Sequence, residues 1–298
     1  MNTTTLTPTW VWNRIIQTCI RVYRRSPLYP QWGKCFAKLL HLLGRSHTSL
    51  FVHDCGRFRL NIDLNQVIDS HIYYNGSFEP DAVNTISQLV TEDAKVVDIG
   101  ANIGCHTLHL ASCVGPGGRV IAFEPTAWAR GRLIDNLALN QFQQVVVQEL
   151  GLSDQKGSVE TSIQSSYRLD GGSDETNALI HFVTLDEYFV NNPVDRLDFI
   201  KIDTDGMEFR ILRGAENTLR RFKPHLLFEV APEGLEENGS SAVELLEWLR
   251  KLGYEFYHDG SLKPYSNELD SIVRRISTGT SQNVVAISKD NQRFEVAQ

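Results

Sequence analysis

The sequence has no run approaching the roughly 18 consecutive apolar residues that a membrane-spanning helix requires. Its first nine residues contain no basic side chain, and Arg14 interrupts the first apolar stretch, so we expect no secretory signal. The five cysteines include no C-x-x-C pair and no spacing typical of a zinc site, which favours a reducing compartment. We therefore expect a cytoplasmic globular protein, and 298 residues allow one large or two small domains.

Acidic side chains are absent from the first 53 residues, which carry seven lysines and arginines. The rest of the chain holds 22 basic and 36 acidic residues, so a segment of charge +7 precedes a body of charge −14. Residues 11–25 place apolar side chains on one side of a helical wheel and arginines on the other, and residues 32–43 show a second helical pattern. We expect a basic helical N-terminal arm over 1–69 and a main domain over 70–298.

Two roles are open for this arm. It either packs as a helical cap on the main domain, or makes a peripheral contact with anionic lipid at the inner membrane face or with an acidic partner.

Short β-branched runs alternate with helical patterns in the main domain. Continuous apolar strands joined by crossover helices are typical of a parallel sheet that is covered on both faces. We therefore predict an α/β fold with a doubly wound, mostly parallel sheet. Strands are expected at 96–99, 120–123, 145–150, 199–202 and 226–230, helices at 103–113, 126–140, 207–222 and 241–252, hairpins at 50–64 and at 254–257 with 284–287, and a polar surface loop at 163–178.

The clearest chemical motif is a turn that follows the strand at 96–99. Gly100 and Gly104 allow close backbone approach, with Ala101 and Asn102 between them. Asn102 stands where a G-x-G-x-x-G dinucleotide fingerprint has its middle glycine, and Asp98 would repel a pyrophosphate. S-adenosylmethionine has no phosphate and carries an ammonium, a sulfonium and a carboxylate, so it suits this turn better.

Glu124 ends the next strand, 20 residues after Gly104. A carboxylate at this place can accept hydrogen bonds from both ribose hydroxyls of a nucleoside ligand. Pro125 then stops the strand and directs the chain into the following helix.

Three acids lie at the end of the strand at 199–202: Asp203, Asp205 and Glu208. A helix begins near Gly206, and its dipole favours acids there, so simple N-capping is the alternative interpretation for Asp205. Three acids in six residues are more than capping needs, and clustered carboxylates raise one another's pKa, which makes one of them a better base. Glu229 ends the next strand and is a further candidate.

These segments together resemble the FkbM family of S-adenosylmethionine-dependent O-methyltransferases. The resemblance implies a class I methyltransferase fold with a seven-stranded sheet, and methyl transfer to a hydroxyl, often on a sugar or a polyketide-type product. Asp205 departs from the family, which more often has glutamate there. The resemblance runs through 97–104, 122–125, 136–140, 151–154, 200–208, 212–215 and 227–230, and 78–80 resembles the segment by which the family's chain enters the domain.

On this basis we expect Asp203 to lie against the bound methionine and the active methyl group. Glu208 or Asp205 would position or deprotonate the acceptor hydroxyl, and Glu229 would share this duty. Ser153 or Asp154 would bind the adenine amine, and Glu79 would close over the methionine end. The expected cofactor contacts are Glu79, Asp98, Gly100, Ala101, Asn102, Gly104, Glu124, Pro125, Ser153, Asp154 and Asp203.

Other interpretations use the same residues. Asp203, Asp205, Glu208 and Glu229 are oxygen ligands that suit Mg²⁺ or Ca²⁺, so a divalent metal is an alternative. An NAD-dependent dehydrogenase and a non-catalytic methyltransferase-like binding module are the rival functions. The acidic body, which has no basic and aromatic surface, argues against nucleic acid and favours a small-molecule or glycan acceptor, and the oligomeric state stays open.

Overall fold

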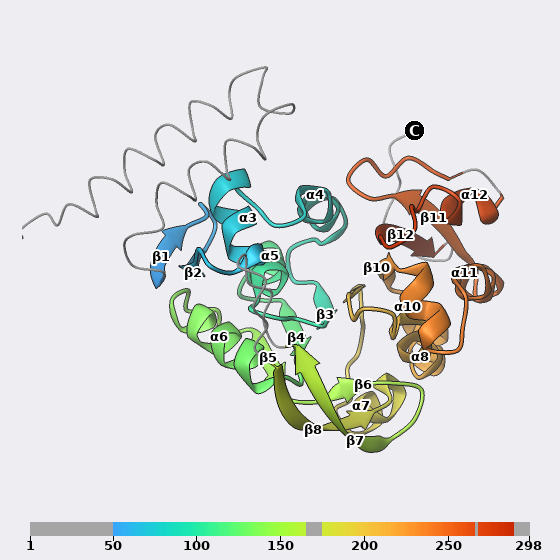
Figure 1. Ribbon diagram of the computed structural model, residues 1–298, viewed down its shortest axis with the longest axis horizontal. Coiled ribbons are helices and arrows are strands. Elements are labelled where there is room, and N and C mark those ends of the chain that lie inside the picture. Colours follow the sequence, from blue (N-terminus) through green and yellow to red (C-terminus); the bar gives the residue numbers. More distant parts are fainter. Residues whose placement is uncertain (1–49, 165–174, 266–267, 289–298) are drawn as a thin grey trace, which may run out of the picture. The chain divides into compact units, whose positions relative to one another are not determined.

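The computed structural model describes residues 50–164, 175–265 and 268–288 (Figure 1). The chain divides into two compact units, Met1–Phe78 with Ser166–Asp174, and Glu79–Ser165 with Glu175–Gln298. The predicted boundary near residue 70 stays a prediction. The two helices predicted before residue 44 lie outside the described residues.

The described part of the smaller unit is a hairpin followed by one helix. β1 (Leu50–Asp54) pairs with β2 (Arg59–Asp63) in antiparallel register, which confirms the predicted hairpin. Leu60 and Ile62 are fully buried, as the alternation of the strand requires. α3 (Val67–Asn75) follows, and its buried Asp69 carboxylate accepts the Asp63 backbone N–H at 2.8 Å, which ties the helix to the hairpin.

The larger unit contains a seven-stranded sheet in the order β11-β12-β10-β9-β3-β4-β5. The five strands from β10 to β5 are parallel, and β12 runs antiparallel to both β10 and β11. This confirms the predicted doubly wound sheet and the late hairpin. The strands are β3 (Lys95–Ile99), β4 (Arg119–Phe123), β5 (Val145–Gln148), β9 (Phe199–Ile202), β10 (His225–Val230), β11 (Tyr254–His258) and β12 (Gln282–Ser288).

Helices cover both faces of this sheet (Figure 1). Val97 and Ile99 of β3 face one core with α7, α8, α9 and α11, whereas Val96 faces the other core with α4 and α5. Successive residues of a strand point to opposite faces, so an apolar strand serves both cores. The helices are α4 (Pro80–Leu89), α5 (Cys105–Val114), α6 (Ala127–Ala138), α7 (Leu185–Asn191), α8 (Glu208–Arg213), α9 (Glu216–Phe222), α10 (Pro232–Glu237), α11 (Ala242–Lys251) and α12 (Asp270–Val273).

Two predicted elements were wrong in their extent. The single helix expected at 207–222 is interrupted between α8 and α9 at Gly214, where an added Cβ would lie 2.1 Å from the Ser153 carbonyl oxygen. The helix is therefore interrupted at the residue that packs closely against the Ser153 backbone. The helical pattern of the sequence gives no information about this contact.

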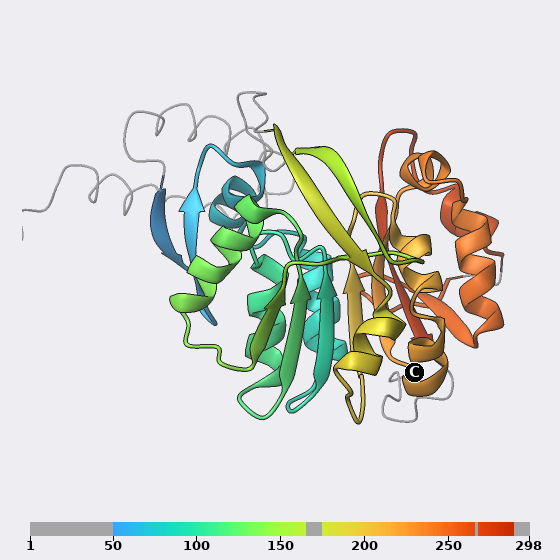
Figure 2. The ribbon, with the colours of Figure 1, turned by 90° about the horizontal axis from the view of Figure 1, so that it is seen from below.

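The loop expected at 163–178 was also too long. β7 (Gly157–Gln164) and β8 (Glu175–Val183) pair in antiparallel register, so both ends of that range are strand, and residues 165–174 lie outside the described part. Figure 2 shows this long ribbon in yellow-green. β6 (Gly151–Leu152) pairs with β8 to complete a three-stranded sheet that the sequence did not predict.

Among the described residues, none of the helices combines the length and hydropathy needed to cross a membrane.

Candidate functional site

Polar side chains lie on one face of the sheet, near the carboxyl ends of its strands. Asp98 of β3 is in register with Lys201 of β9, and Lys201 with Leu227 of β10. Leu227 belongs to the core formed with α4 and α5. Because side chains at alternate positions share a face, Asp203 and Glu229 continue this face beyond Lys201 and Leu227.

Lys201 is a buried cation between two of the predicted acids. Its Nζ lies 3.1 Å from Asp203 Oδ2 and 3.7 Å from Asp98 Oδ1, and the residue is only 3% exposed. Burial by itself lowers the pKa of Lys201, but the charges of Asp203, Asp98 and Glu79 outweigh this and hold the pKa above its ordinary value. Lys201 therefore carries a positive charge inside the site.

Asp98 is completely buried beneath this lysine. Its Oδ2 accepts a hydrogen bond of 2.6 Å from Thr107 Oγ1 of α5. Burial raises its pKa, and the charge of Lys201 and the Thr107 hydrogen bond oppose that rise. Within the described residues Oδ1 accepts no hydrogen bond, and it is paired with the Lys201 ammonium at 3.7 Å.

The glycine turn after β3 is held tightly against β4 and β9. Gly100 (φ 77°), Asn102 (φ 51°) and Gly104 (φ 93°) have left-handed backbone conformations. A Cβ on Gly100 would lie 1.9 Å from the carbonyl oxygen of Asp203. The backbone N–H groups of Gly100 and Ala101 both donate to the carbonyl oxygen of Phe123 in β4. The glycine is required because two backbones meet here.

Glu124 helps to shape this turn. Its Oε2 accepts the Asn102 backbone N–H at 2.8 Å, and its Oε1 accepts the backbone N–H and the hydroxyl of Thr126. Burial raises the pKa of Glu124, and these hydrogen bonds oppose the rise. Each carboxylate oxygen offers about two acceptor positions, so Oε2 retains capacity for a ribose hydroxyl. The Pro125 carbonyl accepts from Arg130 Nη1 of α6 at 2.7 Å.

Glu208 holds the acid-rich turn in shape. It is 0% exposed, and its Oε1 accepts both the backbone N–H and the hydroxyl of Thr204 at 2.9 Å. Burial raises its pKa despite these bonds. By contrast, Asp205 is exposed, with φ 53°, and Gly206 packs directly on the backbone of Gly234. The three acids of the turn therefore occupy different environments.

Glu229 has the properties of a base that works near neutral pH. The carboxyl is half-buried and accepts a hydrogen bond from Ser281 Oγ. Burial, together with repulsion from Asp203, Glu208 and Asp205, raises its pKa to about 7. The predicted acids after β9 and β10 therefore interact electrostatically as one cluster.

Glu79 and His106 complete the site from α4 and α5. Burial and repulsion from Asp203 raise the pKa of Glu79 to about 7, and burial together with Lys201 holds the pKa of His106 well below its ordinary value. Ligand atoms of Glu79, His106 and Asp203 all lie within 4.8 Å of one another, which is compact enough for a metal ion. The Lys201 ammonium already supplies a cation to Asp203, which makes these residues a less suitable metal site.

The predicted adenine residues have partners of their own. Asp154 accepts hydrogen bonds from Arg210 Nε and Nη2 at 3.0 Å and from Arg213 Nη2 at 2.9 Å. Burial alone raises the pKa of Asp154, but the hydrogen bonds and charges of Arg210, Ser153 and Arg213 together lower the pKa overall. Ser153 is buried and donates to Asp154 at 3.2 Å. The adenine contact of both residues stays a prediction.

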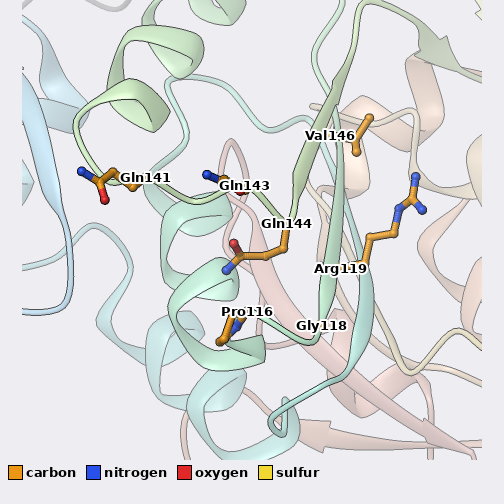
Figure 3. Close-up of a pocket in the computed structure, with 7 residues that line it drawn as sticks. All are labelled: Pro116, Gly118, Arg119, Gln141, Gln143, Gln144 and Val146. Carbon is orange, nitrogen blue, oxygen red and sulfur yellow. The ribbon is translucent and has the colours of Figure 1, made fainter.

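A surface pocket lies elsewhere in the larger unit (Figure 3). Arg119 begins β4 and Gln144 immediately precedes β5, so this pocket is at the amino ends of the strands. Ligands of parallel α/β sheets bind at the carboxyl ends, which makes this pocket a poor candidate for the site. Its lining residues are Pro116, Gly118, Arg119, Gln141, Gln143, Gln144 and Val146.

The sequence-based interpretation missed Lys201. A signal was present, because Lys201 is the only charged residue of the buried strand β9 and lies two positions before Asp203. Period-two spacing places both side chains on one face, so a buried ion pair follows from that pattern.

The strand order, the single antiparallel strand β12, and the acids at the carboxyl ends of β3, β4 and β9 define the class I methyltransferase fold. The methyltransferase FkbM domain matches residues 98–256, more than half of the chain, and the chain belongs to this family.

Individual relatives cover parts of the chain. AMB antimetabolite synthetase AmbE of Pseudomonas aeruginosa is 24% identical over 237 residues, which are 66% of this chain and 11% of that protein. Hexuronic acid methyltransferase AglP of Haloferax volcanii is 28% identical over 144 residues, 48% of this chain and 58% of that protein. The solved structure of methyltransferase FkbM from Methylobacillus flagellatus KT is 18% identical, with a TM-score of 0.42, and the match covers 74% of this chain and 54% of that one.

Proposed function

We propose that the protein transfers a methyl group from S-adenosylmethionine to a hydroxyl of a carbohydrate or related small molecule. The observation that carries this proposal is the pair of buried acids, Asp98 and Glu124, on either side of a turn whose glycines admit close backbone approach. Family membership supports methyl transfer. The name of AglP, a hexuronic acid methyltransferase, supports a carbohydrate acceptor.

The residues fit this cofactor. The carboxylates of Asp98 and Asp203 contribute negative charge that favours an ammonium and a sulfonium, and Glu124 Oε2 offers an acceptor for a ribose hydroxyl. The cofactor supplies an activated methyl group when bound. Because direct displacement depends mainly on alignment, the protein's task is to orient the cofactor and the acceptor and to remove one proton.

Glu229 is our proposed general base. An alcohol is a poor nucleophile until its proton is removed, and a base works best when its pKa lies near the working pH. Glu229 meets this condition, whereas Glu208 is fully buried and occupied by Thr204. Asp205 is exposed and carries a raised pKa, so it remains the second candidate for contact with the acceptor.

A calorimetric titration tests the cofactor first. We expect S-adenosylhomocysteine to bind and NAD not to bind. Glu124→Gln should weaken binding about tenfold or more, because it removes charge-assisted hydrogen bonds. The matched control is Asp195→Asn, whose carboxylate is exposed and paired with Lys95. Binding of NAD alone would favour a dehydrogenase, and binding of neither ligand would contradict the proposal.

A transfer assay then tests the acceptor. Labelled methyl from S-adenosylmethionine is offered to uronic acids, neutral sugars and a non-sugar alcohol, and the product is examined for an O-methyl group. We expect incorporation into at least one sugar class. Cofactor binding without transfer to any acceptor would support the binding-module alternative.

A further inference from the structure

Lys201 has no role in the function proposed above, yet it is among the most buried charged groups of the larger unit. Only Asp98 and Glu208 are equally enclosed among the charged residues of the site. Burying an ammonium is costly unless carboxylates compensate it, so its neighbours must provide that compensation. Two of them, Asp98 and Asp203, are residues that we assign to the cofactor.

The backbone fixes where the ammonium lies. Lys201 and Asp98 are register partners in the parallel β3–β9 pair, and Asp203 lies two residues further along β9 on the same face. The ammonium therefore bridges the ends of two neighbouring strands, at 3.7 Å from Asp98 and 3.1 Å from Asp203. Neither carboxylate can approach the other without meeting this charge.

We propose that Lys201 is a positioning residue, whose ammonium holds Asp98 and Asp203 in place and in their ionised form at the floor of the cofactor site. This inference rests on the proposed function. Without Lys201, the buried Asp98 carboxylate and the half-buried Asp203 carboxylate would repel each other, and one would take up a proton. A protonated carboxyl attracts a cationic cofactor less, so binding would come to depend on pH.

Several groups face Lys201 and enter any pH dependence. They are Asp98 from β3, Asp203 and Asp205 after β9, Glu79 before α4, and Cys105 and His106 from α5. Glu79 and Glu229 both have a pKa raised to about 7. Glu79 interacts with Lys201 directly and would obscure the two aspartates, whereas Glu229 is common to the proteins that are compared. The experiment therefore uses the full chain carrying Glu79→Gln as its reference.

The test measures the affinity of S-adenosylmethionine by calorimetry between about pH 5 and pH 8. We compare Glu79→Gln with Glu79→Gln plus Lys201→Gln, whose amide can still hydrogen-bond to both aspartates but carries no charge. We expect the loss of affinity on acidification to begin at a higher pH in the Lys201 variant. Through that range the affinity should change by up to about tenfold per pH unit, as for one linked proton.

Glu79→Gln plus Lys95→Met is the matched control. Lys95 begins β3 at the amino end of the sheet and pairs with the exposed Asp195, so its removal should leave the pH profile unchanged. An unshifted profile for the Lys201→Gln variant would overturn the inference, because a lysine that only fills space has no effect on ionisation. Failure of the unaltered protein to bind the cofactor would instead contradict the proposed function itself.

A second pair keeps the test decisive if Lys201→Gln does not fold. In the same Glu79→Gln background, Asp98→Asn is compared with Asp98→Asn plus Lys201→Met, which replaces a buried ion pair by neutral groups and is tolerated more readily. In the variant that carries both substitutions, Asp203 has lost the neighbouring Lys201 ammonium, and residue 98 carries no charge. The same displacement of the pH profile to higher pH is expected, and its absence would refute a charge-based role for Lys201.

Discussion

A methyl group on Gly100 would lie 1.9 Å from the carbonyl oxygen of Asp203. The turn after β3 and the turn after β9 therefore touch through their backbones, and the two predicted halves of the site are joined at this contact. The Asp203 N–H donates to the Ile99 carbonyl at 3.1 Å, which fixes the same approach. Residue 100 therefore has no room for a side chain.

Gly100→Ala is accordingly expected to destabilise the protein. The substitution adds a steric clash with backbone to a positive φ of 77°, and we expect a loss of about 3 kcal/mol in the free energy of unfolding. Urea denaturation measures it. Gly131→Ala is the control, because Gly131 lies inside α6 with open space around it, and it should gain about 1 kcal/mol. Equal stability of the two variants would contradict the contact.

Glu229→Gln should abolish most of the chemistry and leave cofactor binding intact. Removal of a general base typically costs about 100-fold or more in kcat. In the unaltered protein kcat should rise with pH through about 7, because the ionised carboxylate is the active form, and Glu229→Gln should lose this rise. Glu216→Gln, which alters an exposed pair with Arg220, serves as the control. A normal kcat in Glu229→Gln would transfer the role to Asp205.

Glu79 should make the protein less stable as pH rises. Its pKa is raised to about 7 in the folded state, chiefly by burial, so the folded protein binds more protons than the unfolded chain between the ordinary carboxyl pKa and about 7. The stabilisation that comes from protonated Glu79 is complete below the pKa of this side chain in the unfolded chain. It is lost as the pH rises through the pKa of Glu79 in the folded protein.

The variant Glu79→Gln resembles the protonated acid at every pH. We expect it to match the unaltered protein near pH 5 and to be more stable by about 2 kcal/mol near pH 8, with allowance for partial solvent screening of Glu79. Denaturation midpoints at the two pH values measure this difference. Glu237→Gln, at an exposed position, should show no such change. Parallel pH curves for the unaltered protein and Glu79→Gln would refute the assignment.

Chelation of divalent cations should leave methyl transfer unchanged to within about twofold. Lys201 already compensates Asp203, and the Oε1 of Glu208 is occupied by Thr204, so these two acids have partners without a metal. Transfer is measured with EDTA and with added Mg²⁺. Loss of activity in EDTA that Mg²⁺ restores would instead place a metal on Glu79, His106 and Asp203.

Much of the fold could be predicted because its strands are buried on both faces. Continuous apolar runs such as 120–123 and 226–228 predict parallel strands without any knowledge of the tertiary structure, and the spacing between such runs predicts crossover helices. The acids at the strand ends were predictable for the same reason, since the carboxyl ends of parallel strands meet at one edge. Glu124 and Asp203 were found in this way.

The environment of each acid could not be predicted. The Glu208 carboxyl is occupied by Thr204, and Asp154 is occupied by Arg210, which is 56 residues away in the chain. Hydrogen bonds of this kind depend on distances between side chains that a linear pattern does not contain. The beginning of β8 was missed for a related reason, because its polar residues 175–177 have a weak local strand preference that pairing with β7 outweighs.

From its sequence alone, this protein is a doubly wound α/β chain with acids at the ends of particular strands, because hydrophobic periodicity and strand direction are local properties. Only the tertiary structure decided which acid has a pKa raised to about 7, which one holds a turn, and that a buried lysine lies between Asp98 and Asp203. Charge and proton affinity inside a protein depend on burial and on neighbours from other strands, and those are set only when the chain has folded.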